Sequence, residues 1–337
     1  MKEVQNILND IKKGNIKPVY FLAGEESFFI DQISDYIEKN LLPEDAKGFD
    51  QMVVYGLEVN LPDLILQARQ FPMIGDKQVI IVKEAQHLFK KKEDSEALES
   101  YLNKPAESSV LVFNYKYKTL DKRKKITKLI KEKGVYFETK RMYERDVTKW
   151  IVETTRSMGH SIDLKSAQML VDFLGLNLSK IHNELKKLHL ILNEDKAITP
   201  EIIEKHIGIS KDYNNFELKS AIAKGDYLKA QKIITYFVAN PKEHPIVVTV
   251  AILYNFFRDL FIYHSLNDKS KFSVAKALKI NPYFVEEYQV AAHKYPMKKV
   301  TANIGYIKEA DLKSKGVDAG NMTTKDILNE LVFKLMH

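Results

Sequence analysis

The sequence contains no cysteine among its 337 residues. Without thiols the chain cannot form disulfide bonds, bind zinc or an iron–sulfur cluster through cysteine, or use a thiol nucleophile. This composition is typical of proteins from a reducing compartment, so a cytoplasmic location is expected.

Long apolar runs are also missing. The longest, around residues 246–257, is shorter than the ~20 residues that a bilayer requires, and it is interrupted by Thr249 and Asn255. The amino terminus lacks the apolar segment and small-residue cleavage site of a signal peptide. We therefore expect a buried core helix at 246–257 and no membrane partner.

Arginine is scarce, and lysine supplies nearly all of the positive charge behind a net charge of +7. An excess of basic residues is typical of a protein with a polyanionic partner such as DNA. Acidic residues are interspersed along the chain, so lysine-rich, solvated helix faces explain the charge equally well.

The first 140 residues alternate between short apolar runs and amphipathic segments. A parallel sheet with helices on both faces is the usual structure for this alternation. A basic helix is predicted over 121–133, ended by Gly134. The predicted strands cover residues 18–22, 51–55, 79–82, 110–113 and 135–138.

After Lys140 the strand-like runs stop, and helical periodicity takes over. Caps are predicted at Asp146, Asp163 and Thr199, and residues 210–215 are predicted to be a polar linker. The predicted fold class is multi-domain α/β plus all-α. Its predicted domains cover residues 1–140, 141–209 and 210–337.

An α/β domain followed by helices invites a search for a nucleotide site. The P-loop pattern GxxxxGK[ST] cradles phosphate with backbone N–H groups, and the sequence contains no GK[ST]. Gly24-Glu25-Glu26 follows the first predicted strand, where the carboxylates would repel a phosphate. The third strand ends at Lys83-Glu84, where Glu84 could be the acid that holds the metal, but without a phosphate cradle this indicates little. We predict no ATP hydrolysis by this chain and no cofactor.

Other catalytic patterns are equally poor. His182 and His189 could share one helix face with Glu184, but they are interpreted as ordinary residues of an amphipathic helix. Glu25 and Glu26 are adjacent and would point apart, which suits paired acid–base chemistry badly. No catalytic, metal-binding or cofactor-binding residue is predicted, so function must depend on binding surfaces.

The first candidate surface is the run Phe71-Pro72-Met73-Ile74, which links a predicted helix to the third strand. Loops are normally polar, so an apolar one either folds back on the core or offers an anchor to a partner. Composition alone favours packing on the core.

The second candidate surface is the basic stretch 116–133, which includes Lys122, Arg123, Lys124 and Lys125. A basic amphipathic helix can neutralise DNA phosphates. A solvated outer face on a helix that covers the sheet is the competing interpretation.

Several short motifs follow one another along the chain. They comprise Pro18 to Glu26 followed by Ile30-Asp31, Phe71-Pro72-Met73 leading through Gly75-Asp76-Lys77 into residues 79–83, Leu120 to Lys125, Leu178 to Leu188, Asn215 to Leu218 with Ala221-Ile222, and Phe257 to Leu260. Their order resembles the delta subunit family of the bacterial DNA polymerase III clamp loader.

The resemblance implies an AAA+-like domain with a degenerate nucleotide site, a helical lid domain and a carboxy-terminal helical collar that holds the subunits of a hetero-pentamer together. Other loader subunits would bind and hydrolyse ATP. The chain itself would bind and open the sliding clamp for loading onto primed DNA, as a non-catalytic component of a DNA polymerase holoenzyme.

The same resemblance implies a role for the apolar turn. In the family, two adjacent hydrophobic residues at this place enter a pocket of the clamp; here they are Met73 and Ile74, with Phe71 and Pro72 as neighbours. Many relatives carry Leu-Phe or Phe-Phe, so this chain presents less aromatic area. Two rival functions are a DNA-binding adaptor that loads another replication factor and a diverged NTPase.

Overall fold

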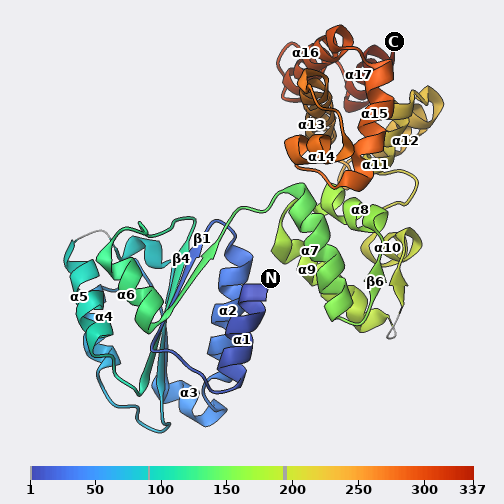
Figure 1. Ribbon diagram of the computed structural model, residues 1–337. Coiled ribbons are helices and arrows are strands. Elements are labelled where there is room, and N and C mark those ends of the chain that lie inside the picture. The colour runs from blue at the N-terminus through green and yellow to red at the C-terminus, as the bar shows by residue number, and fades with distance from the viewer. Residues whose placement is uncertain (1, 90–91, 193–195) are drawn as a thin grey trace. The chain divides into compact units, whose positions relative to one another are not determined.

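A computed structural model describes residues 2–89, 92–192 and 196–337. It divides into two compact units, Met1–Met142 and Tyr143–His337. Each unit is described by itself below (Figure 1).

Unit 1 is built around a five-stranded parallel sheet with the strand order β2-β3-β4-β1-β5. Its strands are β1 (Val19–Gly24), β2 (Gln51–Tyr55), β3 (Gln78–Lys83), β4 (Ser109–Lys116) and β5 (Val135–Thr139). The three central strands are almost wholly buried, as expected for parallel strands covered on both faces. The predicted strands and sheet are confirmed.

Helices lie on both faces of this sheet. Figure 1 shows α1 and α2 on one side and α4, α5 and α6 on the other. The helical elements of unit 1 are α1 (Lys2–Lys12), α2 (Ser27–Asn40), α3 (Glu44–Asp50), α4 (Leu61–Ala68), η1 (Ala85–His87), α5 (Lys92–Asn103) and α6 (Lys125–Lys133).

The basic helix is shorter than predicted. It begins at Lys125 rather than Asp121, because the Asp121 carboxylate accepts hydrogen bonds from the backbone and side chain of Arg123 and closes a turn there. Thr127 Oγ1 donates to the Asp121 carbonyl oxygen and ties this turn to the helix. Gly134 follows the last helical residue, as predicted.

Unit 2 is predominantly helical. Its elements are α7 (Glu144–Ser157), β6 (Ser161–Ile162), α8 (Leu164–Leu174), α9 (Leu178–Ile191), β7 (Ala197–Ile198), α10 (Pro200–Ile207), α11 (Asn215–Lys224), α12 (Tyr227–Ala239), α13 (Ile246–Ser265), α14 (Lys271–Leu278), η2 (Pro282–Phe284), α15 (Val285–Lys294), α16 (Met297–Ser314) and α17 (Thr324–Met336).

Two local predictions for unit 2 are wrong. The strands do not stop at Lys140, since β6 and β7 form a two-stranded parallel pair that is too short to leave an apolar run in the sequence. Asp146 lies inside the first turn of α7, whose N-cap is Tyr143, and there its charge faces the positive end of the helix. The caps at Asp163 and Thr199 are confirmed.

The predicted linker at 210–215 is irregular until α11 begins at Asn215, but it is not a solvated tether. Ser210 and Asn214 are buried, and the Asn214 side chain both donates to the Ser210 carbonyl and caps α11. The division between predicted domains at residues 209 and 210 stays a prediction.

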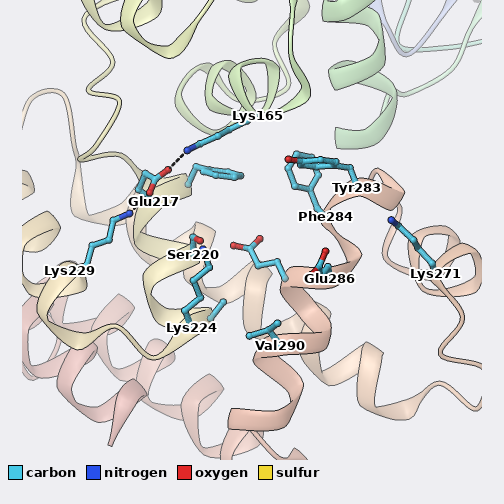
Figure 2. A pocket seen from close by; sticks show the side chains of 13 residues that line it. Lys165, Glu217, Ser220, Lys224, Lys229, Lys271, Tyr283, Phe284, Glu286 and Val290 are labelled. Carbon is cyan, nitrogen blue, oxygen red and sulfur yellow. Dashed lines mark hydrogen bonds and ion pairs between the residues drawn. The ribbon is translucent and has the colours of Figure 1, made fainter.

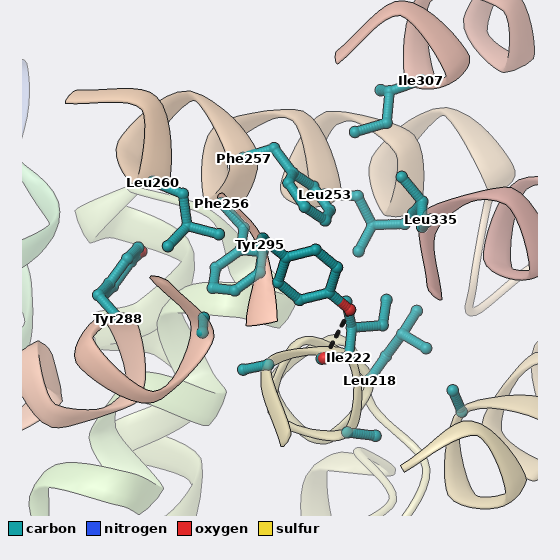
Figure 3. Close-up of a cluster of buried hydrophobic side chains, with 14 of the residues drawn as sticks. Leu218, Ile222, Leu253, Phe256, Phe257, Leu260, Tyr288, Tyr295, Ile307 and Leu335 are labelled. Atoms are coloured by element: carbon teal, nitrogen blue, oxygen red, sulfur yellow. Dashed lines mark hydrogen bonds between the residues drawn. The ribbon is translucent and has the colours of Figure 1, made fainter. Parts of the chain in front are cut away.

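The core of the carboxy-terminal helices surrounds α13, which packs along α16. Figure 3 shows Phe256, Phe257 and Tyr295 meeting Leu218 and Ile222 of α11. The Tyr295 hydroxyl donates a 2.9 Å hydrogen bond to the Ile222 carbonyl, which satisfies the buried phenol.

By length and composition α13 could span a membrane, because it runs for 20 residues rather than ending near residue 257. It is instead the central helix of this core, as the sequence predicts. The face that packs inward carries Val250, Leu253, Phe256, Phe257, Leu260 and Tyr263.

Candidate functional site

The apolar turn, Phe71–Ile74, projects its large side chains into solvent. Phe71 is 87% exposed, Met73 77% and Ile74 53%. Packing on the core, which composition favours, is therefore wrong. Contiguous exposed apolar residues of this kind are typical of a surface that binds a partner.

One anchor of the turn is Gln78, the first residue of β3, whose side chain is buried. Its amide nitrogen lies within hydrogen-bonding distance of the carbonyl oxygens of Gln67 and Gln70, at 3.2 and 2.5 Å, and of Ser109 Oγ at 2.9 Å. The end of α4 is thereby tied to the sheet directly before the turn.

A second anchor is Asp50, the last residue of α3, which is only 4% exposed. One carboxylate oxygen accepts the backbone N–H of Met73, and the other accepts those of Ile74 and Gly75 at 2.9 and 2.7 Å. The hydrogen bonds from Gly75, Met73 and Ile74 outweigh the opposing effect of burial and lower the pKa of Asp50. Sequence reasoning missed both anchors, since neither lies within a recognisable motif.

The position of a phosphate-binding loop lies between β1 and α2, and the protein's own groups fill it. Gly24 donates to the Lys118 carbonyl and accepts from the Tyr117 N–H, at 2.9 and 2.8 Å. Gly24 has φ +122°, and a Cβ there would lie 2.1 Å from the Thr139 carbonyl oxygen. The backbone is thus pressed against β5.

Glu26 also fills the position of the phosphate-binding loop. Its N–H donates to Thr139 Oγ1 at 3.0 Å, and its carboxylate accepts the Phe28 N–H as the N-cap of α2. Burial raises the pKa of this carboxyl, although the Phe28 hydrogen bond opposes that shift. The helix terminus that would bind a phosphate already has an acidic cap.

The acidic side chains near the ends of the central strands also have basic partners. Asp31 forms a 2.7 Å ion pair with Lys116, and Lys83 forms a 3.3 Å ion pair with Glu38. Glu84 has a left-handed backbone, with φ 54°, and lies 4.0 Å from His87 Nε2. The described residues do not bring these acids together as a set of metal ligands.

Three of the four basic residues predicted to face DNA have acidic neighbours. The ion pairs are Lys122 with Glu138 at 2.9 Å, Arg123 with Asp121 at 2.8 Å and Lys125 with Glu99 at 3.3 Å. The hydrogen bonds from Arg123 lower the pKa of Asp121 to about 2. Lys124, the N-cap residue of α6, is exposed.

His182 and His189 do not form a joint site. His189 Nδ1 lies 3.1 Å from Nε2 of the buried His160, whereas His182 lies beside Trp150. Over residues 2–89, 92–192 and 196–337, no group of three or more His, Asp or Glu side chains is placed to hold a metal ion. Both His182 and His189 lie in α9, the predicted amphipathic helix.

A groove of about 690 Å³ lies among α8, α11, α12, α14 and α15 (Figure 2). Glu217 stands at its wall, paired with Lys165 at 2.7 Å and also with Lys229. Burial acts to raise the pKa of Glu217, but the two lysines outweigh it and lower that pKa. Paired charges, rather than a poised acid or base, line this part of the groove.

A buried ionic cluster lies next to the groove. Lys219 Nζ is 3.5 Å from Glu287 Oε2, and Gln168 donates to both Glu144 and Asp172, at 2.6 and 2.7 Å. Burial raises the pKa of Asp172 to about 7, although Lys219 opposes the shift. The cluster joins α7 and α8 to α11 and α15.

Together, the parallel sheet and the filled phosphate position define an AAA+-like module with an exposed apolar turn. A family model described as DNA polymerase III, delta subunit matches residues 20–140, and one described as DNA polymerase III delta subunit, C-terminal domain matches residues 212–335. The chain belongs to the DNA polymerase III delta subunit family.

Individual relatives agree. The chain is 30% identical to the DNA polymerase III subunit delta of Bacillus subtilis over 292 residues, which are 84% of this chain and 83% of that protein. It is 21% identical to the probable DNA polymerase III subunit delta of Aquifex aeolicus over 261 residues, 75% and 72% of the two chains.

A solved structure described as the Bacillus subtilis DNA clamp loader delta protein (YqeN) matches with a TM-score of 0.64 and 25% identity, covering 99% of both chains. Family membership makes this chain a subunit of DNA polymerase III that takes part in DNA replication together with other clamp-loader subunits.

Proposed function

We propose that this chain binds the sliding clamp through the apolar turn and opens it for loading onto primed DNA. The observation that carries the proposal is the exposure of Phe71, Met73 and Ile74 on a turn anchored from two sides. Met73 and Ile74 would enter a hydrophobic pocket of the clamp, with Phe71 and Pro72 beside them.

Opening requires more than attachment. A closed ring opens only if the chain binds the open state more tightly than the closed one, because equal affinity for both states shifts nothing. The turn would therefore dock close to a ring interface, where opening changes the surface available to it. An apolar anchor of this kind contributes about 2 kcal/mol or more to binding.

ATP hydrolysis would belong to other subunits of a cytoplasmic hetero-pentamer. The support is the closure of the phosphate position by Glu26 and Thr139. Residues 1–140 would form the clamp-binding domain, residues 141–209 the lid and residues 210–337 the collar that holds the subunits together. Lys122, Arg123, Lys124 and Lys125 would face primed DNA within the complex.

Surface plasmon resonance without nucleotide tests the proposal, with the sliding clamp of the same organism immobilised. We expect the wild type to bind and a Met73→Ser, Ile74→Ser double variant to bind at least about 30-fold more weakly, which corresponds to about 2 kcal/mol. A matched control is Leu190→Ser, Ile191→Ser, since these adjacent apolar residues are also exposed, but on α9.

The control variant should bind like the wild type. If the wild-type chain fails to bind the clamp, the proposal is wrong, and a DNA-binding adaptor becomes the alternative to test. If the Met73, Ile74 variant binds as tightly as the wild type, the contact lies elsewhere on the chain.

A further inference from the structure

The apolar turn is held out in water, although the hydrophobic effect favours folding it back. Phe71, Met73 and Ile74 would all gain from burial, at roughly 25 cal/mol per Å² of apolar surface. Some other interaction must therefore fix the backbone in the exposed conformation. The Asp50 carboxylate is the group placed to do this.

Asp50 reaches the turn from a distant part of the sequence. Its two oxygens accept three consecutive backbone N–H groups, those of Met73, Ile74 and Gly75, which are 23 to 25 residues further along the chain. Three consecutive amides that converge on one carboxylate leave the backbone between them little freedom. Gly75 also lies against α3, because a Cβ there would be 3.5 Å from both Ala46 Cβ and Asp50 Oδ2.

In the part of the chain that the structure describes, the Asp50 carboxylate contacts these amides and forms no ion pair with a lysine or arginine. Lys47 of the same helix contacts Glu44 and the Lys39 carbonyl, and Lys77 donates to the Glu107 carbonyl at 2.8 Å. A carboxylate at the carboxyl end of a helix is also unfavourable with respect to the helix dipole. Asp50 is thus stabilised mainly by the turn that it holds.

A carboxylate is needed because both oxygens must accept. An asparagine has nearly the same shape but offers one oxygen and an NH₂ group, which would face a backbone N–H in place of an acceptor. Asp50→Asn therefore removes part of this interaction with little change in volume.

We propose that Asp50 is a positioning residue for partner binding, which fixes the backbone of Met73–Gly75 before the partner arrives and so keeps the apolar side chains presented. The inference depends on the proposed function for the identity of the partner. The effect of Asp50 on the backbone of Met73–Gly75 in the free chain does not depend on that function. Preorganisation removes an ordering cost that association would otherwise include.

The first test measures the free chain. Amide hydrogen exchange, read residue by residue by NMR, should show slow exchange at Met73, Ile74 and Gly75 in the wild type and fast exchange there in Asp50→Asn. Exchange in β3 and β4 should stay slow in both proteins. Equal exchange at the three turn amides would overturn the inference.

The second test measures binding to the sliding clamp. Asp50→Asn should bind about 10- to 100-fold more weakly than the wild type, because ordering the equivalent of one or two backbone residues on binding reduces affinity by about that factor. The loss should fall mostly on the association rate, since only a fraction of the variant molecules present the turn correctly. A change confined to the dissociation rate would contradict preorganisation.

A second variant separates positioning from folding. Asp50→Ala removes the acceptor entirely and leaves the turn amides open to water, so it should weaken binding at least as much as Asp50→Asn, and circular dichroism should match the wild type for both. Fast exchange with unchanged affinity in either folded variant would overturn the positioning role. Failure of the wild type to bind would overturn the proposed function and this role with it, while the exchange result would still show whether Asp50 holds the turn.

Discussion

Thr139 Oγ1 accepts a 3.0 Å hydrogen bond from the Glu26 backbone N–H and joins the end of β5 to the segment between β1 and α2. In a nucleotide-binding protein such N–H groups would be left for phosphate. Here a side chain takes the hydrogen bond, and the Glu26 carboxylate caps the adjacent helix. The sequence Gly24-Glu25-Glu26 predicts a segment whose carboxylates would repel a phosphate. The hydrogen bonds show that the protein's own groups also fill this position.

The first prediction concerns nucleotide. Isothermal titration of the purified chain with MgATP should give no saturable heat at millimolar ligand, because the phosphate position is filled and negatively charged. A protein with a complete P-loop serves as the positive control. A dissociation constant in the micromolar range would contradict the account and revive the diverged NTPase.

The second prediction concerns the core of unit 2. Phe257 is fully buried, and its ring packs edge-on against Tyr295 with the centroids 5.3 Å apart. Phe257→Ala should lower the free energy of unfolding of unit 2 by about 3–5 kcal/mol, from lost burial and the cavity left behind. Trp150, the single tryptophan, reports unfolding of this unit by fluorescence.

Phe261→Ala is the matched control for that measurement. Phe261 lies one turn further along α13 but is 42% exposed, so its loss should cost well under half as much. Equal destabilisation by the two substitutions would show that the packing around α13 differs from that described above.

Sequence patterns predicted the parts of this fold that depend on neighbouring residues. Buried parallel strands leave continuous apolar runs, which is why the five strands of unit 1 could be placed. The start of α6 could not be predicted, because residues 121–125 suit a helix and the hydrogen bonds between Arg123 and Asp121 decide the outcome.

The candidate site was predictable only in part. The apolar character of Phe71–Ile74 is visible in the sequence, but its exposure depends on Asp50 and Gln78, which lie in other elements. Contacts that join α3 to a turn more than 20 residues away leave no local signal. The pairing of His160 with His189 escaped prediction for the same reason.

The third prediction concerns pH. The pKa of Asp172 is raised to about 7 by burial, whereas an unfolded aspartate has a pKa of about 3.9. Between these values the folded state holds a proton that the unfolded state lacks, so the stability of unit 2 should fall as pH rises from about 4 to about 7. Asp259, whose pKa burial raises to about 6, acts in the same direction.

Asp172→Asn tests this dependence, because asparagine resembles the protonated acid. The variant should be more stable than the wild type at pH 8 by about 1–2 kcal/mol, and the difference should shrink towards pH 5. Denaturant unfolding followed by Trp150 fluorescence provides the measurement, with the α7 surface variant Glu153→Gln as control. A stability difference that does not vary with pH would contradict the assignment.

The fourth prediction concerns DNA. Because Lys122, Arg123 and Lys125 have acidic partners, Lys124 should contribute most to phosphate binding by this segment. Lys124→Ala should reduce the slope of log K against log salt concentration by about 0.9, the effect of one phosphate contact. Fluorescence anisotropy with primed DNA, at salt concentrations between roughly 50 and 200 mM, measures this slope.

Lys125→Ala is the comparison for this experiment, and we expect it to change the slope less. A larger effect of Lys125 than of Lys124 would show that the pairing with Glu99 does not persist when DNA binds.

Release of clamp rings from circular DNA, without nucleotide, tests most directly whether this chain opens the clamp. Rings are first placed on nicked circular DNA, the purified chain is added, and the clamp that remains is measured after gel filtration. We predict that the wild type releases the rings and that the Met73→Ser, Ile74→Ser variant leaves them in place. A wild-type chain that binds the clamp but leaves every ring on the circle would contradict the account, because it would bind open and closed rings equally.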